Sequence, residues 1–247
     1  MRFVAGSFRL RWIIAVLVLA LALAGAVGTA FHTRSLSQPQ PDRYAPGVLV
    51  GGAAQSAALS GPVARAYLGH FKTQASPSSC GPASALNVLA SIGAPIADER
   101  TLFHGDRWGW LRMRMQGMTL DALAALIAQR RIGEVTVLRD LAYEAFLSQV
   151  RAADNPANRL IVNFDRAPIF GVAIGHFSPI GGFDAERDLV LLLDVTPGYG
   201  PSLIPSKLLY MAVQTPDSTT GRMRGLIRIS GFRTADRATA PPSPRTP

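Results

Sequence analysis

The chain has 247 residues, a formal net charge of +9 and a single cysteine. One cysteine excludes an internal disulfide and any zinc site built from several cysteines. The positive charge is scattered arginine, with Lys72 and Lys207 as the only lysines. No basic helix or aromatic-interleaved basic patch is apparent, so we expect no nucleic-acid partner and instead some attraction to anionic lipid headgroups.

Residues 1–31 are typical of a signal peptide or membrane anchor. Three arginines and no acidic residue come first, and the stretch from Ile13 to Phe31 is uncharged and apolar. Its length is close to the ~20 residues that cross a bilayer, and the arginines would hold its start in the cytoplasm. We therefore expect the rest of the chain to be extracytoplasmic, in the periplasm. Cleavage at the small residues Gly28 and Ala30 stays open. A buried core helix is the weaker alternative, because the stretch is apolar on all sides.

Composition divides the remainder into three parts. Residues 32–59, rich in proline, glutamine and serine at their start, are expected to be a linker. Residues 60–232 are long enough to bury the core of one globular domain. Residues 233–247 are expected to be a disordered tail.

Hydrophobic spacing and turn residues predict mostly helices first and mostly strands afterwards. Helices are expected at 60–68, 81–93, 118–130 (with Thr119 as the N-terminal cap), 142–152 and 205–213. Strands are expected at 134–138, 160–164, 177–182, 189–195 and 226–230. Helices and strands segregated in this way indicate an α+β fold rather than alternating βαβ units.

Cys80 is the first candidate for chemistry. It stands where a serine-rich loop becomes a helix, and the partial positive charge of a helix N-terminus favours a thiolate. Gln74, six residues earlier, has the offset at which papain-like enzymes place a side-chain amide that stabilises an oxyanion. The alternative is a small buried cysteine without reactivity. The combination of Gln74, the helix and a later histidine–aspartate pair favours a nucleophile.

His176 and Asp194 form that pair. A hairpin centred on Ala185 would place the two residues directly opposite each other on neighbouring antiparallel strands, where Cβ atoms are ~5 Å apart. The carboxylate could then orient the imidazole toward the thiol. A bulge at Gly181–Gly182 would break this register.

Four segments together resemble phytochelatin synthase, the glutathione γ-glutamylcysteinyltransferase. They are FKTQASPSSCGPASALNVL, GHFSPIGGFDAERDLVLLLDV, IPSKLLYMAV and TTGRMRGLIRIS, and the resemblance runs from about Tyr67 to Phe232. CGPA is common among papain-like peptidases, whereas HFSPIGG with AERD is much more specific. The resemblance implies a papain-like fold in which a helical first half packs against an antiparallel sheet.

The resemblance also implies the roles of individual residues. Cys80 would be the nucleophile, His176 the general base and acid, Asp194 the residue that orients it, and Gln74 the oxyanion donor. The family cleaves the Cys–Gly bond of glutathione through a γ-glutamylcysteinyl thioester, which passes to a second glutathione or to water. Asp217 and Arg224 fall where the family has polar residues around the substrate, and Arg224 could pair with a glutamyl carboxylate. An exposed charge at a strand start is the equally weighted alternative for Arg224.

Two departures from the family pattern matter. Pro197 and Gly198 stand where plant members carry an arginine after the catalytic acid, and the cysteine-rich C-terminal region is absent. The chain resembles the short bacterial type of the family, which implies that hydrolysis dominates over weak chain extension, and we expect this here. No protein-bound cofactor or metal site is expected, and heavy-metal ions such as cadmium or zinc would enter as thiolate complexes of glutathione. The oligomeric state stays open, a homodimer included.

Two other functions remain in view. One is a cysteine peptidase of the double-glycine leader type, which shares the glutamine–cysteine offset and a later histidine and aspartate. The other is a non-catalytic, membrane-tethered module that binds glutathione or metal. The HFSPIGG–AERD segment disfavours the first and the complete triad disfavours the second.

Overall fold

The computed structural model describes residues 11–26 and 39–232 and divides the chain into two units, 1–38 and 39–247. Residues 11–26 form a helix with exposed apolar side chains. Over the ranges described, no helix combines the length and hydropathy needed to cross a bilayer. The predicted apolar segment continues into residues 27–31, which lie outside the described residues, as does the predicted tail 233–247.

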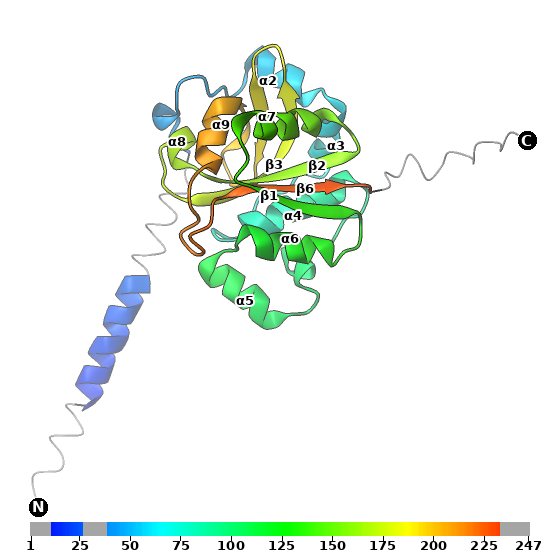
Figure 1. Ribbon diagram of the computed structural model, residues 1–247. Helices are drawn as coiled ribbons and strands as arrows, with labels where there is room; N and C mark the ends of the chain where they lie inside the picture. Colours follow the sequence, from blue (N-terminus) through cyan, green and yellow to red (C-terminus); the bar gives the residue numbers. More distant parts are fainter. Residues whose placement is uncertain (1–10, 27–38, 233–247) are drawn as a thin grey trace, which may run out of the picture. The chain divides into compact units, whose positions relative to one another are not determined.

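A six-stranded antiparallel sheet organises the second unit. Its strands, in spatial order, are β1 (Glu134–Arg139), β6 (Gly225–Ser230), β2 (Asn158–Asp165), β3 (Gly175–Asp184), β4 (Leu189–Asp194) and β5 (Gly200–Pro205). Helices cover both faces, with those between residues 80 and 128 on one side and those between residues 143 and 213 on the other (Figure 1).

Alternation along the strands produces two separate cores, because successive side chains of a strand point to opposite faces. On one face, Ile161, Leu191 and Ile227 pack with residues from α3 (Pro62–Leu68), α4 (Cys80–Ser91) and α6 (Leu120–Ala128). The 3-10 helix η2 (Glu99–Phe103) and α5 (Arg107–Gln116) complete this first core through Leu102, Phe103 and Met113.

The second core lies on the opposite face of the same strands. Val162, Leu192 and Leu226 pack there with α7 (Tyr143–Arg151), α8 (Ala167–Phe170) and α9 (Ser206–Val213). Fully buried apolar residues on both faces explain why β4 reads as the continuous run LVLLL instead of an alternating pattern. The α+β fold expected from the sequence is confirmed, and the helices predicted at 142–152 and 205–213 lie on this face as α7 and α9.

Most predicted elements lie within two or three residues of their expected bounds, and Thr119 caps α6 by accepting a hydrogen bond from the Ala122 N–H. The expected linker is corrected. Residues from Pro39 onward belong to the second unit, with η1 (Pro41–Arg43), α2 (Gly52–Leu59) and a β-bridge between Leu49 and Leu203. Ala54, Ala58 and Leu59 pack on the first core, so this stretch is structured.

Five further elements were not predicted from the sequence: η2, α5, α8, β5 and the short 3-10 helix η3 (Ala152–Asp154). The helix α5 also corrects the expectation that no basic helix exists. Its sequence RWGWLRMRMQ carries three arginines and two tryptophans. Gly109 and the mixed polarity of both helix faces hide it from a search for an apolar stripe.

The hairpin of β3 and β4 has a different register from the one expected. Asp184 pairs with Leu189, which moves the turn centre to Glu186–Arg187, and a bulge at Gly181 shifts the pairing so that Ile180 faces Leu192. Extending that pairing places Ser178, two residues from His176, opposite Asp194. Direct opposition of His176 and Asp194 was therefore wrong, yet both residues remain on one face as diagonal neighbours.

Candidate active site

Cys80 is the first residue of α4 and is half-buried. Its sulfur forms a hydrogen bond with the His176 side chain and accepts two more from the backbone N–H groups of Phe177 and Gly81. Phe177 follows His176 at the start of β3, so the helix N-terminus and the strand meet at the thiol. This is the loop-to-helix position that the sequence predicted for Cys80.

The environment of Cys80 and His176 favours a thiolate–imidazolium pair. Burial alone raises the pKa of the Cys80 thiol, but the charge of His176 and the three hydrogen bonds outweigh burial and lower it. Burial alone lowers the pKa of His176, but the charges of Asp194 and Cys80 and the bond to Asp194 raise it. The two shifts have opposite directions, and each one favours the charged form of its residue.

Asp194 holds the histidine from the opposite side. His176 Nε2 lies 3.1 Å from Asp194 Oδ1, and that oxygen also accepts a hydrogen bond from the Thr196 N–H at 2.7 Å. With Nε2 directed at the carboxylate, Nδ1 is the ring nitrogen that faces the thiol. Burial raises the pKa of Asp194, but the charges of His176 and Arg166 and these hydrogen bonds lower it to about 2. The carboxylate therefore stays ionised although it is buried.

Arg166, which the sequence analysis did not select, is the second partner of Asp194. Its Nη2 donates to Asp194 Oδ2 at 2.7 Å and its Nη1 to Thr196 Oγ1 at 3.2 Å. The guanidinium carbon lies 3.8 Å from the ring centroid of Tyr199 and 5.1 Å from that of Phe170, within cation–π range. Arg166 is almost fully buried. A lone arginine at the end of a predicted strand carries no local signal of this contact, because Asp194 is 28 residues away.

The side-chain amide of Gln74 is engaged within the loop that precedes Cys80. Its Nε2 donates to the Ser76 and Pro77 carbonyls at 3.0 and 3.3 Å, and its backbone N–H donates to the Val195 carbonyl at 2.7 Å. Gln74 thus joins the loop before Cys80 to the segment after Asp194. Its role as oxyanion donor stays a prediction, since the amide would have to turn away from these carbonyls to serve it.

Arg224 lies near the start of β3, and it is buried rather than exposed at its strand start. Arg224 Nη1 is 3.4 Å from Asn163 Oδ1 and 3.9 Å from Asp217 Oδ2, while Asn163 Nδ2 donates to the His176 carbonyl at 3.1 Å. A Cβ at Gly175 would lie 2.5 Å from Arg224 Nη1, so the guanidinium fills the space beside that glycine. The structure therefore connects Arg224 to the His176 backbone through Asn163, with Asp217 beside Arg224.

The arrangement suits acyl transfer through a covalent thioester. It offers a thiol at a helix N-terminus whose pKa is lowered, an imidazole beside it whose pKa is raised, and a buried carboxylate that fixes the imidazole. The first N–H groups of a helix have no intrahelical partner, so the Cys80 N–H can serve a developing oxyanion. Within 11–26 and 39–232, no group of three or more His, Cys, Asp or Glu side chains could hold a metal ion.

Comparison with known proteins places these residues in a family. Residues 65–226 match the family model for phytochelatin synthase. Glutathione gamma-glutamylcysteinyltransferase 3 of Lotus japonicus is 33% identical over 188 residues, which cover 67% of this chain and 37% of the relative. Glutathione gamma-glutamylcysteinyltransferase 1 of Arabidopsis thaliana is 32% identical over 182 residues, 66% of this chain and 36% of the relative. The chain thus matches about a third of the length of these relatives.

Two solved structures resemble the chain more distantly. One is the peptidase domain of Streptococcus ComA, 16% identical, with a TM-score of 0.41 over 65% of this chain and 97% of that domain. The other is a double glycine motif protease from an AMS/PCAT transporter, also 16% identical with a TM-score of 0.41, over 64% of this chain and 86% of the other.

Proposed function

Since the chain belongs to the phytochelatin synthase family, we propose that it is a glutathione γ-glutamylcysteinyltransferase that acts through a thioester on Cys80. The observation that carries the proposal is the Cys80–His176–Asp194 contact chain, in which the hydrogen bonds and charges favour a thiolate. The names of the plant relatives supply the substrate, glutathione.

In the first half-reaction the Cys80 thiolate attacks the carbonyl carbon of the Cys–Gly amide. The oxygen takes up negative charge, which the Cys80 N–H stabilises, and Gln74 would assist after its amide turns. As the C–N bond breaks, His176 gives its proton to the leaving nitrogen, and glycine departs as an amine. The γ-glutamylcysteinyl group remains as a thioester, and His176 is left neutral.

The second half-reaction reverses the proton transfer. Neutral His176 removes a proton from water or from the α-amine of a second glutathione as that nucleophile attacks the thioester. The thiolate leaves, and the product is γ-glutamylcysteine in the first case and phytochelatin in the second. We propose that water is the main acceptor, because Pro197 and Gly198 replace the arginine that plant members place after the catalytic acid.

Arg224 supports recognition of the glutamyl end of the substrate. Its guanidinium is buried, its Nε has no hydrogen-bond partner, and the Nη1 contacts with Asn163 and Asp217 are long. A carboxylate would satisfy these donors in the bidentate geometry that arginine favours. Asp217, whose Oδ2 lies 3.9 Å from Arg224 Nη1, would hold the α-ammonium of the same amino-acid group.

Glycine release from glutathione tests the proposal. Residues 39–247, which contain both cores and all six strands, should release glycine, and Cys80→Ala should release none. Mass spectrometry of the products with and without cadmium separates γ-glutamylcysteine from phytochelatin. Cleavage of a Gly-Gly leader peptide without glycine release from glutathione would contradict the proposal.

We also propose that the domain works outside the cytoplasm, in the periplasm. The arginines that precede the apolar stretch Ile13–Phe31 support this orientation. A fusion of alkaline phosphatase after residue 247 should be active in cells, and exchange of Arg2, Arg9 and Arg11 for glutamate should lower that activity. Equal activity in both fusions would contradict the orientation.

A further inference from the structure

The outer face of α5 has an unusual combination of exposed side chains. Trp108 is 76% exposed, Met115 69% and Leu111 45%. At 3.6 residues per turn, positions i, i+3 and i+7 share one face, so the three side chains form a single apolar ridge along the helix. The opposite face supplies the internal contacts, with Met113 buried and Trp110 packed edge-on against Phe103.

Arginines border this ridge on both sides. On the helical wheel Arg112 lies on one flank, and Arg107 and Arg114 lie on the other. The helix contains no acidic residue, and none of these three arginines forms an ion pair with a residue of the described ranges. An exposed ridge of tryptophan, leucine and methionine between arginines is the side-chain distribution of helices that lie in a membrane interface.

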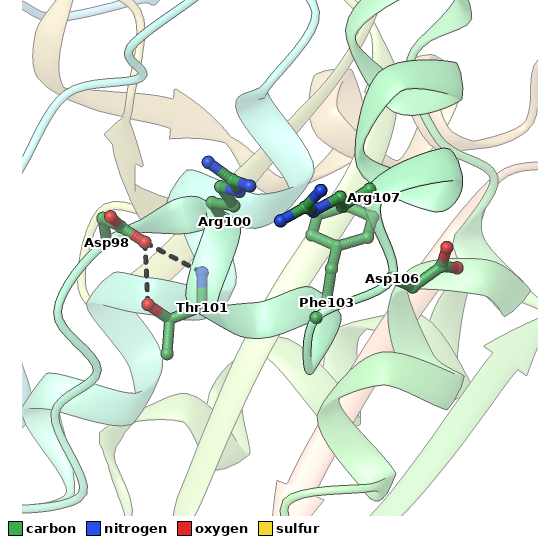
Figure 2. Close-up of a pocket in the computed structure, with 7 residues that line it drawn as sticks. Asp98, Arg100, Thr101, Phe103, Asp106 and Arg107 are labelled. Carbon is green, nitrogen blue, oxygen red and sulfur yellow. Dashed lines mark hydrogen bonds between the residues drawn. The ribbon is translucent and has the colours of Figure 1, made fainter.

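A pocket at the N-terminal end of α5 extends the cationic surface. It has a volume of about 220 Å³, and Arg100 and Arg107 are among the residues that line it (Figure 2). The two acids of this pocket are engaged as helix caps. Asp98 accepts hydrogen bonds from the Thr101 N–H and Oγ1, and Asp106 accepts one from the Gly109 N–H. The two guanidinium groups therefore remain available for a phosphate oxygen.

We propose that α5 and this pocket dock the domain on an anionic lipid surface. The ridge of Trp108, Leu111 and Met115 enters the headgroup region, and the flanking arginines, with Arg100, contact lipid phosphates. Charge supports a lipid occupant, since the whole chain carries a net charge of +9 and anionic membranes attract such surfaces. This docking is independent of the proposed chemistry at Cys80, because none of these residues belongs to the triad.

Vesicle binding by residues 39–247 tests the docking without the apolar N-terminal segment. Vesicles of phosphatidylcholine with one third phosphatidylglycerol should sediment the protein, and pure phosphatidylcholine should bind it much less. The variant Trp108→Ser/Leu111→Ser/Met115→Ser should lower partitioning by about tenfold or more. The matched control Leu68→Ser/Met211→Ser, which removes exposed apolar side chains from α3 and α9, should bind like the unmodified protein.

Tryptophan fluorescence reports on the depth of insertion. This part of the chain contains only Trp108 and Trp110, so emission should shift to shorter wavelength on anionic vesicles, and brominated lipids should quench it. The variant Arg107→Gln/Arg112→Gln should bind more weakly and respond less to salt. Equal binding by the serine variant and the control would overturn the proposal. So would a vesicle-independent change from dimer to monomer in the serine variant, because the ridge would then be a protein interface.

Discussion

Arg166 and Asp194 form a buried ion pair with a nitrogen–oxygen distance of 2.7 Å. The pair lies behind His176, on the side away from the thiol, and ties the end of β2 to the end of β4. Arg166 does not contact Cys80, so we regard it as a positioning residue that keeps Asp194 ionised and correctly oriented.

Arg166→Met should destabilise the domain by about 3–5 kcal/mol, because it leaves a buried carboxylate without its cationic partner. The pKa of Asp194 should rise from about 2, since the guanidinium is one of the charges that lower it. A depressed carboxyl pKa stabilises the fold above the unfolded pKa of ~4, and this stability is lost as the pH falls toward 2. Between pH 7 and pH 3, the free energy of unfolding measured in urea should therefore fall less in the variant than in the unmodified protein. An identical pH dependence in both proteins would contradict this role.

Asp194→Asn should narrow the pH range of activity. The Asp194 charge raises the pKa of His176. Without this charge, burial lowers that pKa, and the basic limb of the pH–rate profile shifts to lower pH. When a smaller fraction of His176 is protonated, the thiolate is stabilised less and the pKa of Cys80 rises. The acidic limb of the pH–rate profile then shifts to higher pH. Glycine release should fall by about 10³–10⁴ at the optimum. The pH dependence of iodoacetamide alkylation of Cys80 checks the thiol shift separately, and an unchanged profile would show that Asp194 is not coupled to the pair.

Gln74→Ala separates two roles for this side chain. If the amide serves the oxyanion, kcat should fall by about 10²–10³ while Cys80 alkylation stays unchanged. If it only holds the loop through the Ser76 and Pro77 carbonyls, alkylation should change together with kcat. Rapid-quench measurement of thioester formation beside the alkylation rate distinguishes the two outcomes.

Arg224→Gln should raise the KM for glutathione by about 10- to 100-fold, because a hydrogen bond to a charged group contributes a binding free energy of that size. The rate of Cys80 alkylation should stay unchanged. Gly175→Ala is the geometric counterpart, because its Cβ would lie 2.5 and 2.8 Å from the two Arg224 Nη atoms and displace them. Gly69→Ala, in open space and without a positive φ, is the control substitution. A normal KM in Arg224→Gln would remove this residue from substrate binding.

Gly181→Ala tests the bulge in β3. The added Cβ would lie 3.0 Å from side-chain atoms of Leu191 and Leu193, so these leucines must shift by a few tenths of an ångström. We expect a loss of about 1–3 kcal/mol in the free energy of unfolding, together with reduced glycine release, because Leu193 directly precedes Asp194. Gly69→Ala again serves as the control, and equal urea midpoints for the two variants would refute the expectation.

The sequence predicted those parts of the protein that local patterns encode. The α+β class followed from helical and strand spacing, and the pairing of His176 with Asp194 followed from their places on one hairpin. The register was wrong because a bulge depends on packing between strands, which no local pattern records. Arg166 was missed because its contact with Asp194 arises only from the spatial order of the strands. The helix α5 was missed because arginines and a glycine obscure its apolar positions.

The bulge at Gly181 makes the number of residues in β3 a condition for catalysis, separate from their identity. If every residue of β3 paired regularly, the pairing of Gly182 with Leu191 would continue to Pro179 opposite Asp194, and His176 would point to the other face. Removal of Gly181 would leave Gly182 opposite Leu191 and Ile180 opposite Leu192, so the imidazole would keep its acid, whereas one residue inserted between His176 and Ile180 would turn the imidazole to the other face. Sequence comparison across this strand must then weigh gaps as heavily as substitutions, because a relative one residue longer here would keep all three side chains and lose their contact.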